Sequence, residues 1–132
     1  GMRSKHGIHV RNFPNAFFVQ PTQGANLISN VPHNLTEAGK TIGIMIKHAQ
    51  DIGAKQIEVS KEAEDEWLAL LATGAGRMMM GNLDCTPGYY NNEGQPLAEG
   101  AFGVGYPQGA FAYFKYIDQW RNDGKFDGIE FR

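Results

Sequence analysis

The polar residues 20–30 join an apolar run at residues 16–19 to a region with helical spacing, and this stretch is the part of the sequence best suited to chemistry. Ser29 or Asn30 can cap the helix that follows. A helix N-terminus presents unpaired N–H groups and a positive dipole end, which suit a phosphate, a carboxylate or an electron-rich carbonyl oxygen. Gly24 would let a ligand approach the backbone closely. An ordinary strand-to-helix connection explains the same residues, and the local sequence alone favours that interpretation.

The histidines and the single cysteine have no spacing typical of a metal site or of a catalytic triad. His6 and His9 lie near the start of the chain, and we predict that both are exposed to solvent. His33 falls in a first helical turn, where a surface position is favoured over ligand contact, and His48 falls where it complements a helix dipole. Cys85 has no basic residue near it in sequence, so its thiol is expected to be inert.

Three helices and a few short strands are expected to position these residues. The run at residues 16–19 is apolar on both alternating faces, which predicts a fully buried strand. The first helix begins near Pro32 and ends at Gly53, and its predicted apolar face comprises Leu35, Ala38, Ile42, Met45, Ile46 and Ala49.

The second helix is predicted to follow the short connection 55–59, to be capped by Ser60, and to fade near Gly74 and Gly76. The third is predicted over residues 109–123, and the tail 126–132 is expected to end in a short strand. Trp67 and Trp120 are expected to anchor the core, together with Ala63, Leu70, Leu71, Tyr113 or Phe114, and Ile117.

Composition excludes several classes of protein. The chain has 132 residues, enough for one small domain, and twelve basic against fourteen acidic residues give a formal charge of −2. That balance argues against nucleic-acid binding, and no apolar run is long enough to span a membrane. A single cysteine excludes an internal disulfide and favours a cytoplasmic location. Gly1 before Met2 is expected to be a remnant of tag removal.

The stretch from Gly74 to Gln108 has no sustained period and contains eight of the seventeen glycines. A segment of this length without regular structure is usually functional or disordered, and its aromatic residues argue against simple disorder.

Five strings in order resemble the C-terminal region of FAD-dependent Baeyer–Villiger monooxygenases, the class B flavoprotein monooxygenases. They are VRNFPNAFFVQPTQ, SNVPH, EVSKEAEDEW, CTPGYYNNEG and FAYFKYIDQWRNDGKFDGIEF. The resemblance covers about residues 7–131 and implies an α+β piece of a flavoprotein with two dinucleotide-binding domains. Residues 16–53 would be the last strand, loop and helix of the FAD domain, and residues 60–132 the C-terminal helices and long loop, within one segment over 2–132.

Enzymes of this family use FAD and NADPH to insert oxygen into ketones through a peroxyflavin. The resemblance implies that one group of residues lies at the flavin edge: Gln23, Gly24, Ser29, Asn30 and Val31. It implies that a second group lines the substrate pocket: Asn26, Leu27, Ile28, Tyr89 and Tyr90. No residue is assigned a catalytic or metal-binding role.

The glycine-rich FAD and NADPH fingerprints are missing from the chain. We therefore expect a C-terminal portion of such an enzyme, inactive alone, that binds no cofactor by itself and partners a missing N-terminal FAD- and NADPH-binding region. The rival hypothesis is a stand-alone, non-catalytic binding module derived from such an enzyme. In either case, exposed apolar surface predicts a homodimer.

Overall fold

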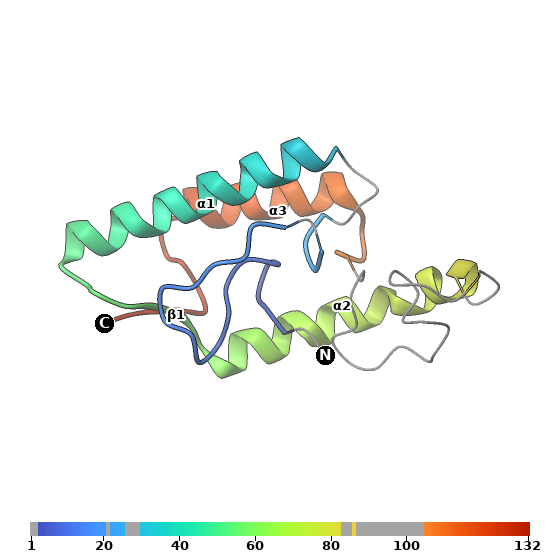
Figure 1. Ribbon diagram of the computed structural model, residues 1–132, viewed down its shortest axis with the longest axis horizontal. Helices are drawn as coiled ribbons and strands as arrows, with labels where there is room; N and C mark the ends of the chain where they lie inside the picture. Colours follow the sequence, from blue (N-terminus) through green and yellow to red (C-terminus); the bar gives the residue numbers. More distant parts are fainter. Residues whose placement is uncertain (1–2, 21, 26–29, 83–85, 87–104) are drawn as a thin grey trace.

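In the computed structural model, three α-helices and a two-stranded antiparallel sheet make up the regular structure of the described residues, 3–20, 22–25, 30–82, 86 and 105–132 (Figure 1). In chain order the elements are α1 (Val31–Ile52), β1 (Ile57–Val59), α2 (Lys61–Asn82), α3 (Ala110–Asn122) and β2 (Ile129–Phe131). Helices α1 and α3 contact each other, and the N-terminal segment lies between this pair and α2. The predicted α+β class with three helices is confirmed.

Helix α1 begins and ends where the sequence predicts. Of the two candidate caps, Asn30 is the one used: its side-chain oxygen accepts a hydrogen bond from the backbone N–H of His33 at 3.3 Å. Gly53 ends the helix in the left-handed conformation (φ 74°), where a residue without Cβ is least strained.

The predicted apolar face of α1 is only partly correct. Ala38, Met45 and Ala49 are buried, but Leu35 and Ile46 are 36% and 43% exposed. The buried face is rotated toward three polar residues, Asn34, Glu37 and Thr41. The ion pair between Glu37 and Arg121 of α3 explains the rotation. Because Arg121 compensates its charge, the Glu37 carboxylate can be buried at a place where an aliphatic side chain was expected.

Helix α2 is capped by Ser60, whose hydroxyl accepts the Ala63 N–H at 3.1 Å. The prediction that α2 fades near Gly74 is wrong, since the helix continues to Asn82. A Cβ at Gly74 would lie 3.1 Å from the Cα of Pro107, so this glycine permits close packing of a distant segment rather than ending the helix.

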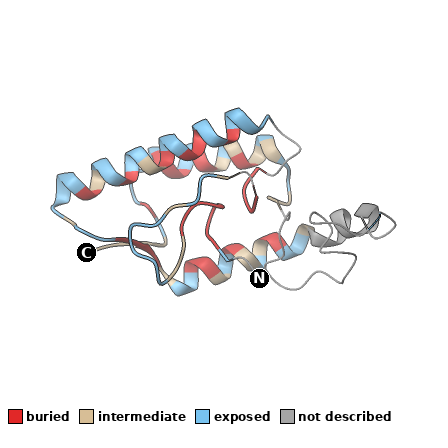
Figure 2. Ribbon diagram, viewed as in Figure 1, coloured by how far each residue is buried: buried red, intermediate tan, exposed pale blue. Residues whose placement is uncertain are grey.

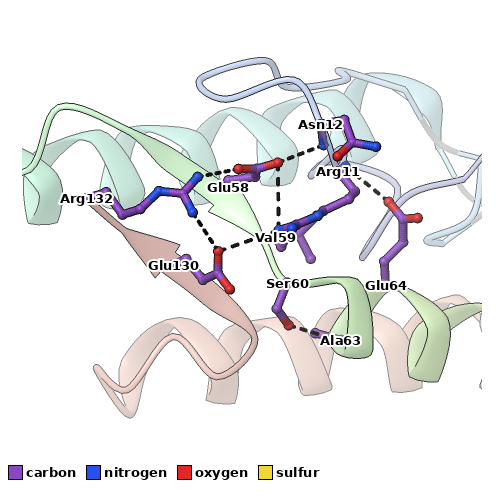
Figure 3. Close-up of polar contacts among 9 residues, drawn as sticks. All are labelled: Arg11, Asn12, Glu58, Val59, Ser60, Ala63, Glu64, Glu130 and Arg132. Carbon is purple, nitrogen blue, oxygen red and sulfur yellow. Dashed lines mark hydrogen bonds and ion pairs between the residues drawn. The ribbon is translucent and has the colours of Figure 1, made fainter.

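The C-terminal tail forms β2, as predicted, and its partner β1 lies in the connection that follows α1. The register places Glu58 directly opposite Glu130, and like charges in directly opposite positions destabilise a sheet. Arg132 pairs with both carboxylates, and Arg11 reaches them from the N-terminal segment with its Nη1 3.8 Å from Glu58 and 3.5 Å from Glu130 (Figure 3). These arginines neutralise the pair and tie the N-terminal segment to the sheet.

The prediction of a fully buried strand at residues 16–19 is wrong for this chain. Phe17 forms one isolated bridge with His9 and packs against the core, whereas Phe18 and Val19 are 41% and 54% exposed. Ala16 is exposed as well, so only Phe17 of these four residues packs on the chain.

The core lies between the α1–α3 pair and α2 (Figure 2), and Trp67 and Trp120 are both in it, as predicted. The buried apolar cluster comprises Ala25, Met45, Ala49, Ile57, Trp67, Leu71, Tyr113, Ile117, Trp120 and Phe126. Within the described part of the chain, no helix is long and apolar enough to cross a membrane, and no group of three or more potential metal ligands occurs.

Candidate functional site

The residues predicted to contact the cofactor fall in two places that the structure describes. Gln23 and Gly24 lie in a turn over residues 22–25, and Asn30 and Val31 form the N-terminus of α1. The other predicted contacts lie outside the described residues: Ser29 of the cofactor group, and Asn26, Leu27, Ile28, Tyr89 and Tyr90 of the pocket group. The predicted roles of both groups remain predictions.

Gln23 is fully buried and has a positive φ of 58°, which is uncommon for a residue other than glycine. Its side-chain oxygen accepts a hydrogen bond from the hydroxyl of Ser4, and its backbone carbonyl accepts one from the indole N–H of Trp67 at 2.9 Å. The described contacts of Gln23 therefore hold the turn to the N-terminal segment and to α2.

Gly24 has close protein neighbours. A Cβ built on it would lie 3.0 Å from the Cζ and Oη atoms of Tyr113 and 3.1 Å from the carbonyl oxygen of His6. Its own carbonyl accepts the backbone N–H of Tyr106 at 2.9 Å. Tyr113 also donates its hydroxyl to the His6 carbonyl at 2.9 Å. The absence of a side chain at Gly24 thus lets α3 and the N-terminal segment close on the turn.

The N-terminus of α1 is on the surface. Asn30 and Val31 are both exposed, and the first turn carries no acidic side chain that would neutralise the positive end of the dipole. His33 is exposed, as predicted, and its ring packs on Phe114 with centroids 4.6 Å apart. This helix terminus can therefore stabilise a negative or electron-rich group placed before it.

A buried ion pair fixes α1 against α3. Arg121 donates to the Glu37 carboxylate at 2.7 Å and to the Glu37 backbone carbonyl at 3.2 Å. Burial alone raises the pKa of Glu37, but hydrogen bonds from Lys40 and Arg121 outweigh it, so the pKa lies below its ordinary value. The charged pair therefore holds α1 against α3 at a point one to two turns from the N-terminus of α1.

The expectation that His6 and His9 are exposed to solvent is wrong: they are 1% and 2% exposed. The His6 ring is surrounded by Trp67, Trp120 and Tyr116, and its Nε2 lies 3.1 Å from the Tyr116 hydroxyl. Burial lowers the pKa of His9 to about 3 and the pKa of His6 well below its ordinary value, so both are neutral. The sequence around them carries no signal of this, since the enclosing rings come from α2 and α3.

A hollow of about 780 Å³ lies beside the N-terminal segment. Its walls are lined by Arg3, Val10, Arg11, Asn12, Phe13, Phe18, Lys61, Glu64 and Asp65. Both carboxylates of the lining, Glu64 and Asp65, pair with Arg3 or Lys61, as in the 3.0 Å contact between Arg3 and Glu64. Pairing of this kind stabilises the local fold.

No protein-family model matches the chain. Curated relatives are similar along nearly all of it: the FAD-binding monooxygenase hmp7 of Hypomyces subiculosus is 34% identical over 98% of the chain. A Baeyer–Villiger monooxygenase of Streptomyces coelicolor is 34% identical over 93% of it. The chain spans about a fifth of the length of these relatives, 21% and 20%.

Solved structures agree with the sequence relatives. A polycyclic ketone monooxygenase from the fungus Thermothelomyces thermophila matches the whole chain with a TM-score of 0.84 and 31% identity, and the match covers 21% of that protein. Cyclohexanone monooxygenase from Rhodococcus sp. Phi1 shares the fold, with a TM-score of 0.74 at 22% identity over 24% of its length. The chain thus corresponds to a C-terminal region of the FAD-dependent Baeyer–Villiger monooxygenases, which confirms the resemblance carried by the five sequence strings.

Proposed function

We propose that the chain is the C-terminal portion of an FAD- and NADPH-dependent monooxygenase of the Baeyer–Villiger type, which converts a ketone to an ester or lactone. The observation that carries the proposal is the exposed N-terminus of α1, without acidic residues, in a chain that matches the polycyclic ketone monooxygenase over its whole length. The chemistry supplied by bound FAD, reduced by NADPH, is the transfer of one oxygen atom from O₂ to the ketone.

In this proposal the chain contributes position and charge stabilisation. The backbone N–H of Val31 and the positive end of the α1 dipole would stabilise the flavin ring where negative charge gathers on reduction, since Pro32 has no N–H and the His33 N–H is bound by the Asn30 side chain. Asn30 and Val31 are exposed, so this contact requires no rearrangement of α1. Residues 26–28, with Tyr89 and Tyr90, line the substrate pocket.

The preceding part of the enzyme supplies the dinucleotide fingerprints that this sequence lacks. Its contact surface on this chain includes the exposed side chains of Phe18 and Val19 in the 16–19 segment. Apolar contacts with these side chains would complete the burial that the sequence pattern predicts. The chain by itself is inactive.

Reassembly tests the proposal. The chain is fused after the Streptomyces coelicolor relative from which the matching fifth has been removed, and the fusion is compared with the intact relative and with the chain alone. We expect the fusion to retain FAD and to oxidise NADPH when a ketone is added, and the chain alone to do neither. Flavin binding with NADPH oxidation by the chain alone would contradict the fragment proposal. A folded fusion that retains no FAD would contradict the proposal that this chain takes part in flavin binding.

A stand-alone interaction module is the second candidate, and the exposed Phe13 and Phe18, which line the hollow, favour it. Such a surface would pair two copies in a symmetric homodimer. The gene neighbourhood separates the candidates, since an upstream reading frame with both dinucleotide fingerprints supports the enzyme and its absence supports the module.

A further inference from the structure

One face of α1 is apolar and yet open to solvent. Four of its residues recur at the i, i+4, i+7 and i+11 positions that share a helical face, and Gly43 adjoins them; the four are Leu35, Gly39, Ile42 and Ile46. Leu35 and Ile46 are 36% and 43% exposed, and Ile42 is half-buried. Helix α1 lies at the edge of the molecule (Figure 2), and these five residues form what we call the α1 apolar face.

The charged residues of α1 lie on a different face. They are Glu37, Lys40, Lys47 and Asp51, and they form the pairs Lys40–Glu37 and Lys47–Asp51. Because their spacing follows a second helical stripe, none of the four interrupts the α1 apolar face over its length of about 16 Å. A solvated helix face normally carries polar or charged residues, so an aliphatic face without charge indicates contact with another apolar surface.

Gly39 and Gly43 permit close packing on this face. A Cβ built on either one would have no contact within 4 Å with another segment of the described residues. Glycine is a poor residue for the interior of a helix, and no described neighbour of α1 requires the missing side chains. Two glycines about one turn apart instead allow another helix to approach closely, beside the aliphatic side chains of Leu35 and Ile46.

The relatives indicate what covers the face. The match takes in 98% of this chain but only 21% of the FAD-binding monooxygenase hmp7, and the whole chain but 21% of the polycyclic ketone monooxygenase. Most of each relative therefore has no counterpart here. The α1 apolar face begins about one turn from the N-terminus of α1, the end that the proposed function places at the flavin. Continuity along the helix thus favours the flavin-binding part of the enzyme over a second copy of this chain.

We propose that the α1 apolar face is a docking surface for the preceding, FAD-binding part of the monooxygenase, which packs an aliphatic helix against it. The inference rests on the proposed function and deepens it, because it adds a second surface to the contact at Phe18 and Val19. It also accounts for the sequence pattern. The apolar face predicted for α1 includes Leu35, Ile42 and Ile46, and the side that this chain leaves exposed is the side that the preceding part covers.

Thiol labelling measures whether the face is covered. Ile46→Cys places a thiol on the α1 apolar face, and Lys47→Cys is the matched control on the charged side of the same turn. Cys85→Ser in both variants leaves the introduced thiol as the only one in the chain. Reaction with iodoacetamide is followed in the 132-residue chain and in the fusion described above, by mass spectrometry of the peptide that carries the thiol. Both substituted residues are exposed, so neither change is expected to unfold the chain.

We expect the Ile46→Cys thiol to react about tenfold more slowly in the fusion than in the chain alone, and the Lys47→Cys thiol to react at similar rates in both.

Gly43→Leu is a second test, because its effect should change sign. In the chain alone it should raise the urea midpoint, since leucine favours a helix and the space around Gly43 is open. In the fusion it should lower the midpoint, because the new side chain would occupy the place of the docked helix. Lys47→Leu, on the charged face, should have the same small effect in both proteins.

Equal labelling rates of Ile46→Cys in the chain alone and in a fusion that retains FAD would overturn the docking surface and leave the proposed function intact. Slow labelling in the chain alone would also overturn it, because a second copy or another segment of this chain would then cover the face. A Gly43→Leu midpoint that rises equally in both proteins would contradict it as well. A folded wild-type fusion that binds no FAD would refute the proposed function, and with it the identity of the proposed partner.

Discussion

Lowering the pH from 7 to 5 should destabilise the chain through its two buried histidines. In the native state His6 and His9 are neutral, because burial and the nearby charge of Lys5 disfavour their protonated forms. In the unfolded chain both take up protons below pH 6.5. The unfolded state then binds more protons than the native state, so the free energy of unfolding falls as the pH falls. The stabilisation is complete above about pH 6.5 and is lost progressively below it.

The size of the change in the free energy of unfolding can be worked out for His9. With a pKa of about 3 in the native state and an ordinary value of 6.5, it costs about 2 kcal/mol between pH 7 and pH 5. His6 acts in the same direction. The carboxylates do not obscure this interval, because Glu37 and Glu58 have pKa values below their ordinary 4.5 and lose their stabilising charge only at lower pH.

Urea unfolding at pH 7, 6 and 5 measures the effect, and His9→Gln removes one titrating group without adding a charge. We expect the pH dependence between 7 and 5 to shrink by about 2 kcal/mol in this variant. His33→Gln makes the same substitution at an exposed histidine and serves as the control for the exchange of side chain itself. Unfolding free energies that stay constant from pH 7 to 5, or a directly titrated pKa near 6.5 for His9, would refute the reasoning.

Three other substitutions test the packing. Gly128→Ala should lower stability by about 2–4 kcal/mol in urea unfolding, because φ is +89° and the new Cβ would lie 2.5 Å from that of Ala63; Gly39→Ala, with open space around it, should be neutral or stabilising. Arg121→Met should cost about 1–3 kcal/mol by the same assay, because the buried Glu37 carboxylate keeps Lys40 but loses its hydrogen bond from Arg121; adding Glu37→Met should recover most of that loss. If Phe18 lies at the contact of the homodimer proposed as the second candidate, Phe18→Ser should shift light scattering of the isolated chain toward monomer; an unchanged dimer would exclude Phe18 from the contact, and a monomeric wild-type chain would exclude the homodimer.

Local signals in the sequence were sufficient for both ends of α1 and for the start of α2. Asn30, Gly53 and Ser60 act within a few residues of themselves, so their types reveal their roles before any tertiary contact is known. Gly74 shows the limit of that reasoning. A lone glycine inside a helix lowers stability by only about 1 kcal/mol relative to alanine, so it need not end the helix. Here the missing side chain lets Pro107, from a distant part of the chain, pack closely on α2.

The candidate site was predictable at the helix terminus and not at the turn. The position of Asn30 and Val31 at the start of α1 follows from the capping pattern, and the predicted surface position of His33 is confirmed. The burial of Gln23 and of both N-terminal histidines depends on Trp67, Tyr113, Tyr116 and Trp120, which reach them from α2 and α3. No pattern of period 2 or 3.6 within residues 3–25 contains that information.

The 16–19 segment shows why an apolar pattern can predict burial that the chain alone does not provide. Phe17 packs on the core, whereas Ala16, Phe18 and Val19 are exposed, so this chain covers the run at one residue only. A run that is apolar on both faces is typical of a strand between two layers. The chain accounts for one layer and spans about a fifth of its relatives, and our proposal assigns the second layer to the preceding part of the enzyme. The exposure of Phe18 and the exposure of the α1 N-terminus then have one cause, since both would face the part that holds the cofactor.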